Sequence, residues 1–131
     1  MGRTTYKDIF QMNNYDFLKW IKETFTISVP SAVTTAAEME IAAEQMLRLS
    51  AEYEYITEMA SYAKVYCREL KRLADNDDTY DEVYEYMVDK KDIIENKSKA
   101  IKQAYSGISR AVSVKIENNQ ELKLTGVRVA A

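Results

Sequence analysis

Two long stretches of the chain carry apolar residues at the spacing of a helical heptad. In residues 31–74 and again in residues 79–119, these side chains recur at alternating steps of three and four, which places them along one side of a helix. The first seam consists of Met39, Ala42, Met46, Leu49, Tyr53, Ile56, Ala60, Ala63, Cys67, Leu70 and Ala74. The second consists of Tyr80, Tyr84, Met87, Lys91, Ile94, Ser98, Ile101, Tyr105, Ile108 and Val112.

Short polar residues separate the two stretches. Asp75, Asn76, Asp77 and Asp78 favour a turn, because side chains of this kind compete with helical hydrogen bonds. Two helices of similar length joined by so few residues form an antiparallel pair. The sequence therefore predicts an all-α fold, built on a long antiparallel helical hairpin that resembles a coiled coil.

The segments on either side of the hairpin are shorter. Residues 1–30 are predicted to form a short N-terminal helix and a linker, with Asn13 or Asn14 as the cap and an aromatic face that buries Trp20. Pro30 marks a break, after which Ser31 or Thr34 caps the first long helix. Residues 120–131 are predicted to be a tail with an extended piece near 122–129, although a terminal hairpin also fits their alternating pattern.

The composition agrees with a helical domain. The chain has 131 residues, 47% hydrophobic and 30% charged, which is ordinary for one globular or coiled-coil domain. Three glycines and one proline are too few for the turns of a many-stranded β protein. No apolar run is long enough for a membrane-spanning helix, and the N-terminus lacks the apolar core of a secretory signal, so we expect a cytoplasmic protein.

The inventory of reactive side chains argues against catalysis. The chain has no histidine and one cysteine, which removes Ser-His-Asp and Cys-His catalysis and the usual zinc sites. The single cysteine, Cys67, lies on the first seam and is interpreted as a small core residue. The acidic turn fails as a calcium loop, because Tyr80 and Tyr86 stand where a glycine and a bidentate acid are required. We expect no enzyme, no metal and no cofactor.

Two charged segments are candidates for binding. Nine acidic residues lie between Asp75 and Glu95, whereas seven basic residues follow Asn96. On a helical wheel a basic stripe lies opposite the second seam and could contact nucleic acid. It consists of Lys99, Lys102, Ser106 and Arg110. The acidic segment is interleaved with tyrosines and suits a protein interface, together with an apolar flank of the first helix. This predicted interface consists of Asp77, Asp81, Tyr80, Tyr84, Tyr86, Met59 and Tyr66.

Two polar residues interrupt the second seam. Lys91 either reaches a carboxylate or solvent, while Ser98 bonds back to its own helix, or the two fix the register of an oligomer. Apolar residues outside the seams, such as Leu47, Met59, Tyr66 and Leu73, favour contact with further helices. A homo-oligomer is therefore expected.

One segment carries a family resemblance. The run from Asp89 to Ile94, leading into residues 102–110, resembles small helical proteins of tailed bacteriophages, and in layout their recombination mediators. The resemblance covers the second long helix. It implies an oligomeric accessory protein in the bacterial cytoplasm that binds single-stranded nucleic acid or a recombination protein. Two alternatives remain open, namely an inhibitor that binds a host enzyme or defence complex through its acidic tyrosine-rich segment, and a structural assembly protein without a ligand.

Overall fold

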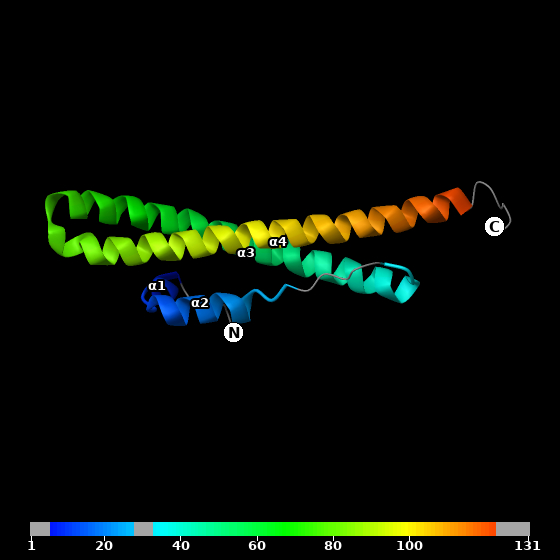
Figure 1. Cartoon of the computed structure of the whole chain (residues 1–131), viewed down its shortest axis with the longest axis horizontal. Helices are drawn as coiled ribbons and strands as arrows, with labels where there is room; N and C mark the ends of the chain where they lie inside the picture. The colour runs from blue at the N-terminus through cyan, green and yellow to red at the C-terminus, as the bar shows by residue number, and fades with distance from the viewer. Residues whose placement is uncertain (1–5, 28–32, 123–131) are drawn as a thin grey trace. The chain divides into compact units, whose positions relative to one another are not determined.

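The computed structural model describes residues 6–27 and 33–122, and of residues 117–122 it describes the backbone only. These residues form the helices α1 (Tyr6–Phe10), α2 (Asn14–Thr24), α3 (Ala36–Asn76) and α4 (Asp81–Leu122), with a 3₁₀ turn, η1 (Asp78–Tyr80), between the last two (Figure 1). The described part of the chain contains no strand. The predicted all-α fold with two long helices packed as a hairpin is confirmed.

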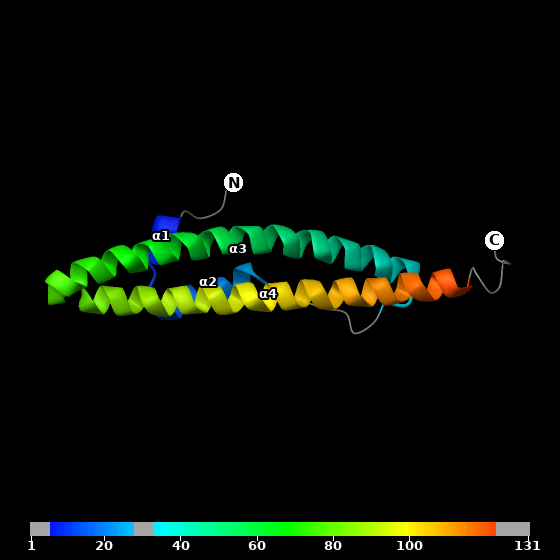
Figure 2. The same cartoon turned by 90° about the horizontal axis from the view of Figure 1, so that it is seen from above.

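The described residues fall into two compact units. The first contains residues 6–26 and 52–100, and the second contains residues 27, 33–51 and 101–122. Each unit holds one part of α3 and the antiparallel part of α4 beside it (Figure 2). The first unit also holds α1 and α2.

The predicted seams form the core of both units. On α3, five seam positions are buried, namely Ala42, Leu49, Ile56, Ala63 and Cys67, and the other six are half-buried. On α4 the buried seam positions are Met87, Ile94, Ile101 and Ile108. Complete burial of an isoleucine contributes about 1.5–3 kcal/mol relative to an exposed one, so these positions supply much of the stability of the pair.

The polar position Lys91 on the second seam reaches carboxylates at the edge of the helix pair. Its ammonium lies 3.4 Å from Oε1 of Glu95 and 3.5 Å from Oδ1 of Asp92, and the side chain is 25% exposed. This confirms the interpretation that Lys91 pairs with a neighbouring acid, which is how a long basic side chain buries its stem and keeps its charge solvated.

The N-terminus of α3 differs from the prediction. The helix begins at Ala36, and Thr35 is its cap, because the Thr35 hydroxyl accepts a hydrogen bond from the backbone N–H of Glu38 (3.1 Å). Glu38 in turn accepts from the N–H groups of Thr34 (3.1 Å) and Thr35 (3.0 Å), which completes a capping box. The predicted cap Thr34 instead donates its hydroxyl to Glu38, and Ser31 lies outside the described residues.

The turn between the long helices forms where the sequence predicted it. Helix α3 ends at Asn76, and Oδ1 of Asp77 accepts hydrogen bonds from the backbone N–H (3.0 Å) and hydroxyl (2.8 Å) of Thr79. These bonds from Thr79 lower the pKa of Asp77. At its far end α4 continues to Leu122, three residues beyond the predicted boundary, and the rest of the predicted tail lies outside the described residues.

The N-terminal helices pack against the hairpin inside the first unit. Asn13 caps α2, since its Oδ1 accepts from the N–H of Asp16 at 2.8 Å. Phe17 and Phe25 are fully buried, and the Trp20 ring lies between them, with ring centroids 6.2 and 6.0 Å away. Trp20 therefore packs in an aromatic cluster, as predicted.

Candidate functional site: a groove beside α1

The first unit contains a groove of about 680 Å³ where α1 meets the two long helices. Its walls come from α1 and the turn that follows it, from α3, and from the beginning of α4. The lining residues are Lys7, Phe10, Gln11, Met12, Asn13, Tyr66, Glu69, Leu70, Val83, Tyr86, Met87 and Lys90. The short helix α1 thus completes a concave surface that the hairpin alone does not provide.

The docking of α1 depends on aromatic contacts with α3. Ile9 is fully buried, and the ring of Tyr6 lies 4.6 Å from that of Tyr62. Phe10 makes an edge contact with Tyr66, with ring centroids 5.3 Å apart. Such pairs stabilise by about 0.5–1.5 kcal/mol beyond the area they bury, so these rings hold the wall formed by α1 in place.

Much of the lining is apolar and open to solvent. Tyr66 is 42% exposed, Val83 is 51% exposed and Tyr86 is 47% exposed, whereas Met87 at the base is 5% exposed. Exposed aromatic and aliphatic side chains that gather in a concavity are typical of binding sites. The groove therefore has the surface character of a site that covers apolar groups.

A buried lysine lies in the wall of the groove. Lys90 is 3% exposed and its ammonium donates a hydrogen bond to Oδ1 of Asn14 at 3.0 Å. The amide of Asn14 donates to Asp89 at 3.2 Å. The ammonium also lies 5.9 Å from the ring centroid of Phe17 and 5.8 Å from that of Tyr86, which is within the range of cation–π attraction.

Burial and one nearby charge act in opposite directions on Lys90. Burial lowers the pKa of the ammonium, and the neighbouring charge of Asp89 raises it, with a net lowering. No carboxylate forms an ion pair with Lys90 among the described residues. The result is a cationic group that is held by an amide and two aromatic rings.

The remaining charges of the groove leave it positive. The carboxylate of Glu69 forms a hydrogen-bonded ion pair with Arg72 on the same helix, and this hydrogen bond lowers the pKa of Glu69. Lys7 is exposed on α1 and forms no ion pair within the described part of the chain. Lys7 and Lys90 therefore lie in an apolar lining, and neither forms an ion pair within residues 6–27 and 33–122.

The predicted protein interface is divided by the structure. Tyr66 and Tyr86 line the groove, whereas Asp77, Tyr80 and Asp81 are exposed but lie outside its lining. Tyr84 lines a separate depression. The assignment of Met59 to an uncovered flank is wrong, because its side chain is fully buried in the core of the first unit.

The predicted basic stripe on α4 is exposed. Lys99 belongs to the first unit, and Lys102, Ser106 and Arg110 belong to the second. None of the three cations forms an ion pair within the regions that the structure describes. None of the four residues lines the groove.

Several groove residues have no signal in the sequence pattern. Lys90 lies one position away from the seam residue Lys91, and heptad spacing alone gives no reason for its burial. Phe10 and Met12 become part of a wall only through the docking of α1, which lies far from α4 in the chain. A pattern of positions within one helix does not contain this information.

Comparison with known protein families, curated proteins and solved structures finds no match to this chain. Within residues 6–27 and 33–122, no cluster of three or more histidine, cysteine or acidic side chains could hold a metal ion. None of the described helices combines the length and the apolar character needed to cross a membrane.

Proposed function

We propose that this chain is a non-enzymatic interaction protein whose groove binds an amphipathic segment of a partner protein. The observation that carries the proposal is the pairing of an apolar lining with two lysines that form no ion pair among the described residues. Tyr66, Val83 and Tyr86 offer apolar area to cover, and Lys7 and Lys90 offer positive charge. The complementary partner is a segment with apolar side chains and at least one carboxylate.

The openness of the lining favours a protein segment over a small molecule. A site for a small ligand covers most of that ligand and its own lining, whereas Val83 and Tyr86 are each about half exposed. Covering a large apolar side chain contributes about 1.5–3 kcal/mol, so a few such contacts give measurable affinity once the cost of association is subtracted. Tyrosines at the site provide contact area and a hydrogen bond together.

Selection of peptides from a random display library on the purified protein tests this proposal. We expect the selected peptides to carry apolar residues at helical spacing together with aspartate or glutamate. Val83→Asp should weaken their binding at least tenfold, because it places a negative charge in the groove opposite an acidic segment. Val65→Asp is the matched control, since Val65 is 56% exposed on α3 and lies outside the groove.

The two variants also separate a groove from a generally sticky surface. Circular dichroism of both variants verifies that an exposed substitution leaves the fold intact. If the library gives no specific peptide, or if Val65→Asp weakens binding as much as Val83→Asp, the proposed binding function is wrong.

A second candidate function is nucleic-acid binding by the exposed basic stripe. Lys99, Lys102 and Arg110 project from α4 without ion pairs among the described residues, and phosphate contacts by such side chains give salt-dependent affinity. The resemblance to phage recombination mediators supports this candidate and adds an oligomeric assembly in the cytoplasm of a bacterial host. An oligomer would repeat the stripe around an axis and increase the effective concentration of cations along a strand.

A single-stranded DNA titration at two salt concentrations tests the second candidate. We expect binding at low salt that falls steeply at high salt, and a loss of at least tenfold for the double variant K99E/K102E. The control K19E/K22E reverses two exposed lysines of α2 and should leave most of the affinity. No binding at low salt, or equal losses in the two variants, would contradict this candidate. Light scattering on the same samples gives the oligomeric state.

A further inference from the structure

A second depression lies between α3 and α4 in the first unit, and its lining is basic. It has a volume of about 280 Å³ and is lined by Lys64, Cys67, Arg68, Lys71, Tyr84 and Lys91. Four of these six residues are cations and none is a carboxylate. The whole chain has a net charge of −3, so a depression lined by four cations is a local concentration of positive charge in an acidic protein.

The helical spacing of the sequence creates this cluster. Lys64, Arg68 and Lys71 occur at steps of four and three, which places them on one face of α3. Lys91 comes from the seam of α4 and is 25% exposed, so most of its stem is packed and its ammonium is held at the edge of the helix pair. The cluster therefore has one half-buried member on α4 and three exposed members on α3.

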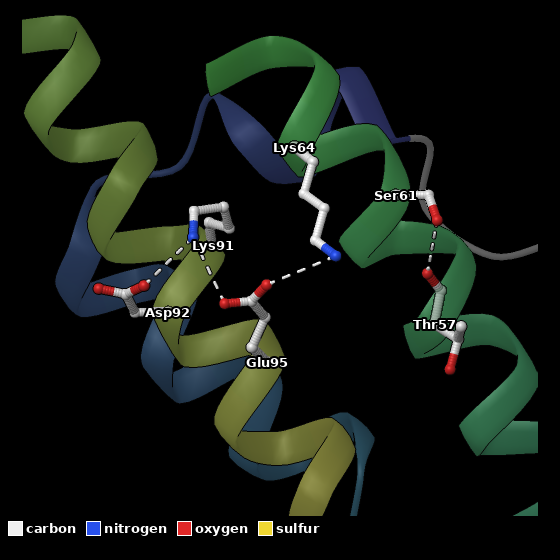
Figure 3. Close-up of polar contacts among 6 residues, drawn as sticks. All are labelled: Thr57, Ser61, Lys64, Lys91, Asp92 and Glu95. Atoms are coloured by element: carbon white, nitrogen blue, oxygen red, sulfur yellow. Dashed lines mark hydrogen bonds and ion pairs between the residues drawn. The ribbon is translucent and has the colours of Figure 1, made fainter. Parts of the chain in front are cut away.

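Nearby carboxylates neutralise part of this charge. Glu95 lies 3.4 Å from the ammonium of Lys91 and 3.9 Å from that of Lys64, and Figure 3 shows the two lysines approaching it from the two helices. Asp92 also pairs with Lys91, at 3.5 Å. The ammonium of Lys71 lies 3.3 Å from Asp75.

Arg68 differs from the other three cations of the depression. No carboxylate pairs with its guanidinium among the residues that the structure describes. Four cations therefore face three carboxylates. The 3.9 Å separation between Lys64 and Glu95 is also longer than a hydrogen bond, so this lysine loses little when it turns to another anion. The depression retains an unsatisfied positive charge.

We propose that this depression binds a phosphate or polyphosphate group. A guanidinium matches the geometry of phosphate oxygens with two parallel N–H donors, and lysine ammonium groups add charge around it. Tyr84 also lines the depression, and its side chain carries a hydroxyl that can donate a hydrogen bond. The volume is below that of a site for a whole cofactor, which suits an anionic group rather than a large organic ligand.

The test is an NMR titration of the full-length protein with sodium tripolyphosphate at low ionic strength. We expect the backbone amide shifts to change most in residues 64–71 and around Tyr84 and Lys91. Arg68→Gln should weaken binding at least tenfold. Arg48→Gln is the matched control, because Arg48 is an exposed arginine on α3 outside both the depression and the basic stripe of α4, and the affinity of this variant should stay within twofold of wild type.

A parallel titration with a twelve-nucleotide oligothymidylate separates two sources of the same phosphate chemistry. If both probes shift the amides of residues 64–71, the site recognises phosphate groups whether free or carried on a nucleotide chain. If only tripolyphosphate does so, the ligand is a small phosphoanion. The proposal is overturned if neither probe shifts these amides, or if Arg68→Gln and Arg48→Gln weaken tripolyphosphate binding equally.

Discussion

Replacement of Lys90 by methionine tests how the protein tolerates a cation in the wall of the groove. The Lys90 side chain is 3% exposed, and its ammonium has one hydrogen-bond acceptor, Asn14, and two aromatic rings around it. Methionine has a similar length and no charge, so Lys90→Met keeps most of the packing and removes the ammonium.

The magnitude follows from opposing contributions. The substitution loses a hydrogen bond to a charged group, about 1.5–3 kcal/mol, and two cation–π contacts of about 0.5–1 kcal/mol each. It also removes the desolvation penalty of a buried ion, which is several kcal/mol. The pKa of Lys90 is lowered, because the effect of burial exceeds the opposing effect of Asp89. The interactions of the ammonium in the folded protein therefore do not fully offset its desolvation penalty. We therefore expect Lys90→Met to be at least as stable as wild type at pH 7, by up to about 1 kcal/mol.

The pH dependence gives the sharper readout. In the unfolded chain Lys90 titrates near 10.5, and in the folded chain it titrates lower. Between these two values the unfolded state binds more protons, so the wild-type free energy of unfolding rises with pH through this window relative to the variant. Above pH 10.5 the penalty of the buried charge is gone. Urea unfolding of both proteins between pH 7 and pH 11 measures the difference, in which other titrating groups cancel.

Two results would refute this reasoning. One is a Lys90→Met variant that is less stable than wild type by more than about 1 kcal/mol at pH 7, since this would mean that the ammonium stabilises the fold. The other is a stability difference between the two proteins that stays constant from pH 7 to pH 11.

Three further predictions concern the helices themselves. Ile94→Ala should lower the free energy of unfolding by about 2–5 kcal/mol, measured by urea unfolding, because Ile94 is fully buried in the helix pair. Ile56→Asp should cost more than about 3 kcal/mol or prevent folding, and a stable, helical variant would contradict the seam. Thr35→Ala should cost about 0.5–2 kcal/mol through loss of the cap, with Thr57→Ala as an exposed control outside the cap.

A last prediction concerns Glu38, the acidic residue of the capping box. The hydroxyl and N–H of Thr34, together with the bonds from Thr35, lower the folded-state pKa of Glu38 below its ordinary value of 4.5. Its contribution to stability is therefore present above pH 4.5 and is lost as the pH falls through the folded-state pKa. Glu38→Gln should flatten this part of the pH profile of thermal unfolding, whereas Glu40→Gln, an exposed glutamate two residues further along the helix, should not.

The hairpin could be predicted because its information is local and periodic. Ile56 on α3 and Ile94 on α4 lie at seam positions and are fully buried. The spacing of the seam residues shows which side of each long helix packs against the other long helix. The turn could also be predicted, because the short polar side chain of Asp77 accepts a hydrogen bond from the backbone N–H of Thr79 within it. The cap was misplaced by one residue because Thr34 and Thr35 both have the required hydroxyl, and only the backbone geometry distinguishes them.

The groove could not be predicted because it depends on contacts between distant segments. Lys90 is buried by Asn14 and Phe17, which lie more than 70 positions earlier in the chain. Met59 was assigned to a free surface because a hairpin alone leaves its side of α3 uncovered, yet its side chain is fully buried. Heptad periodicity describes how two helices face each other and gives no information on where a short third helix docks.

The most direct test of the proposed groove uses the methionine methyl groups as reporters. Met12 and Met87 line the groove, whereas Met59 is buried elsewhere in the first unit and Met39 and Met46 lie in the second. In a methyl NMR titration with a selected acidic amphipathic peptide, we expect the Met12 and Met87 signals to shift and the other three to stay. A peptide that binds while the Met12 and Met87 signals remain unchanged would contradict the assignment of the groove as the binding site.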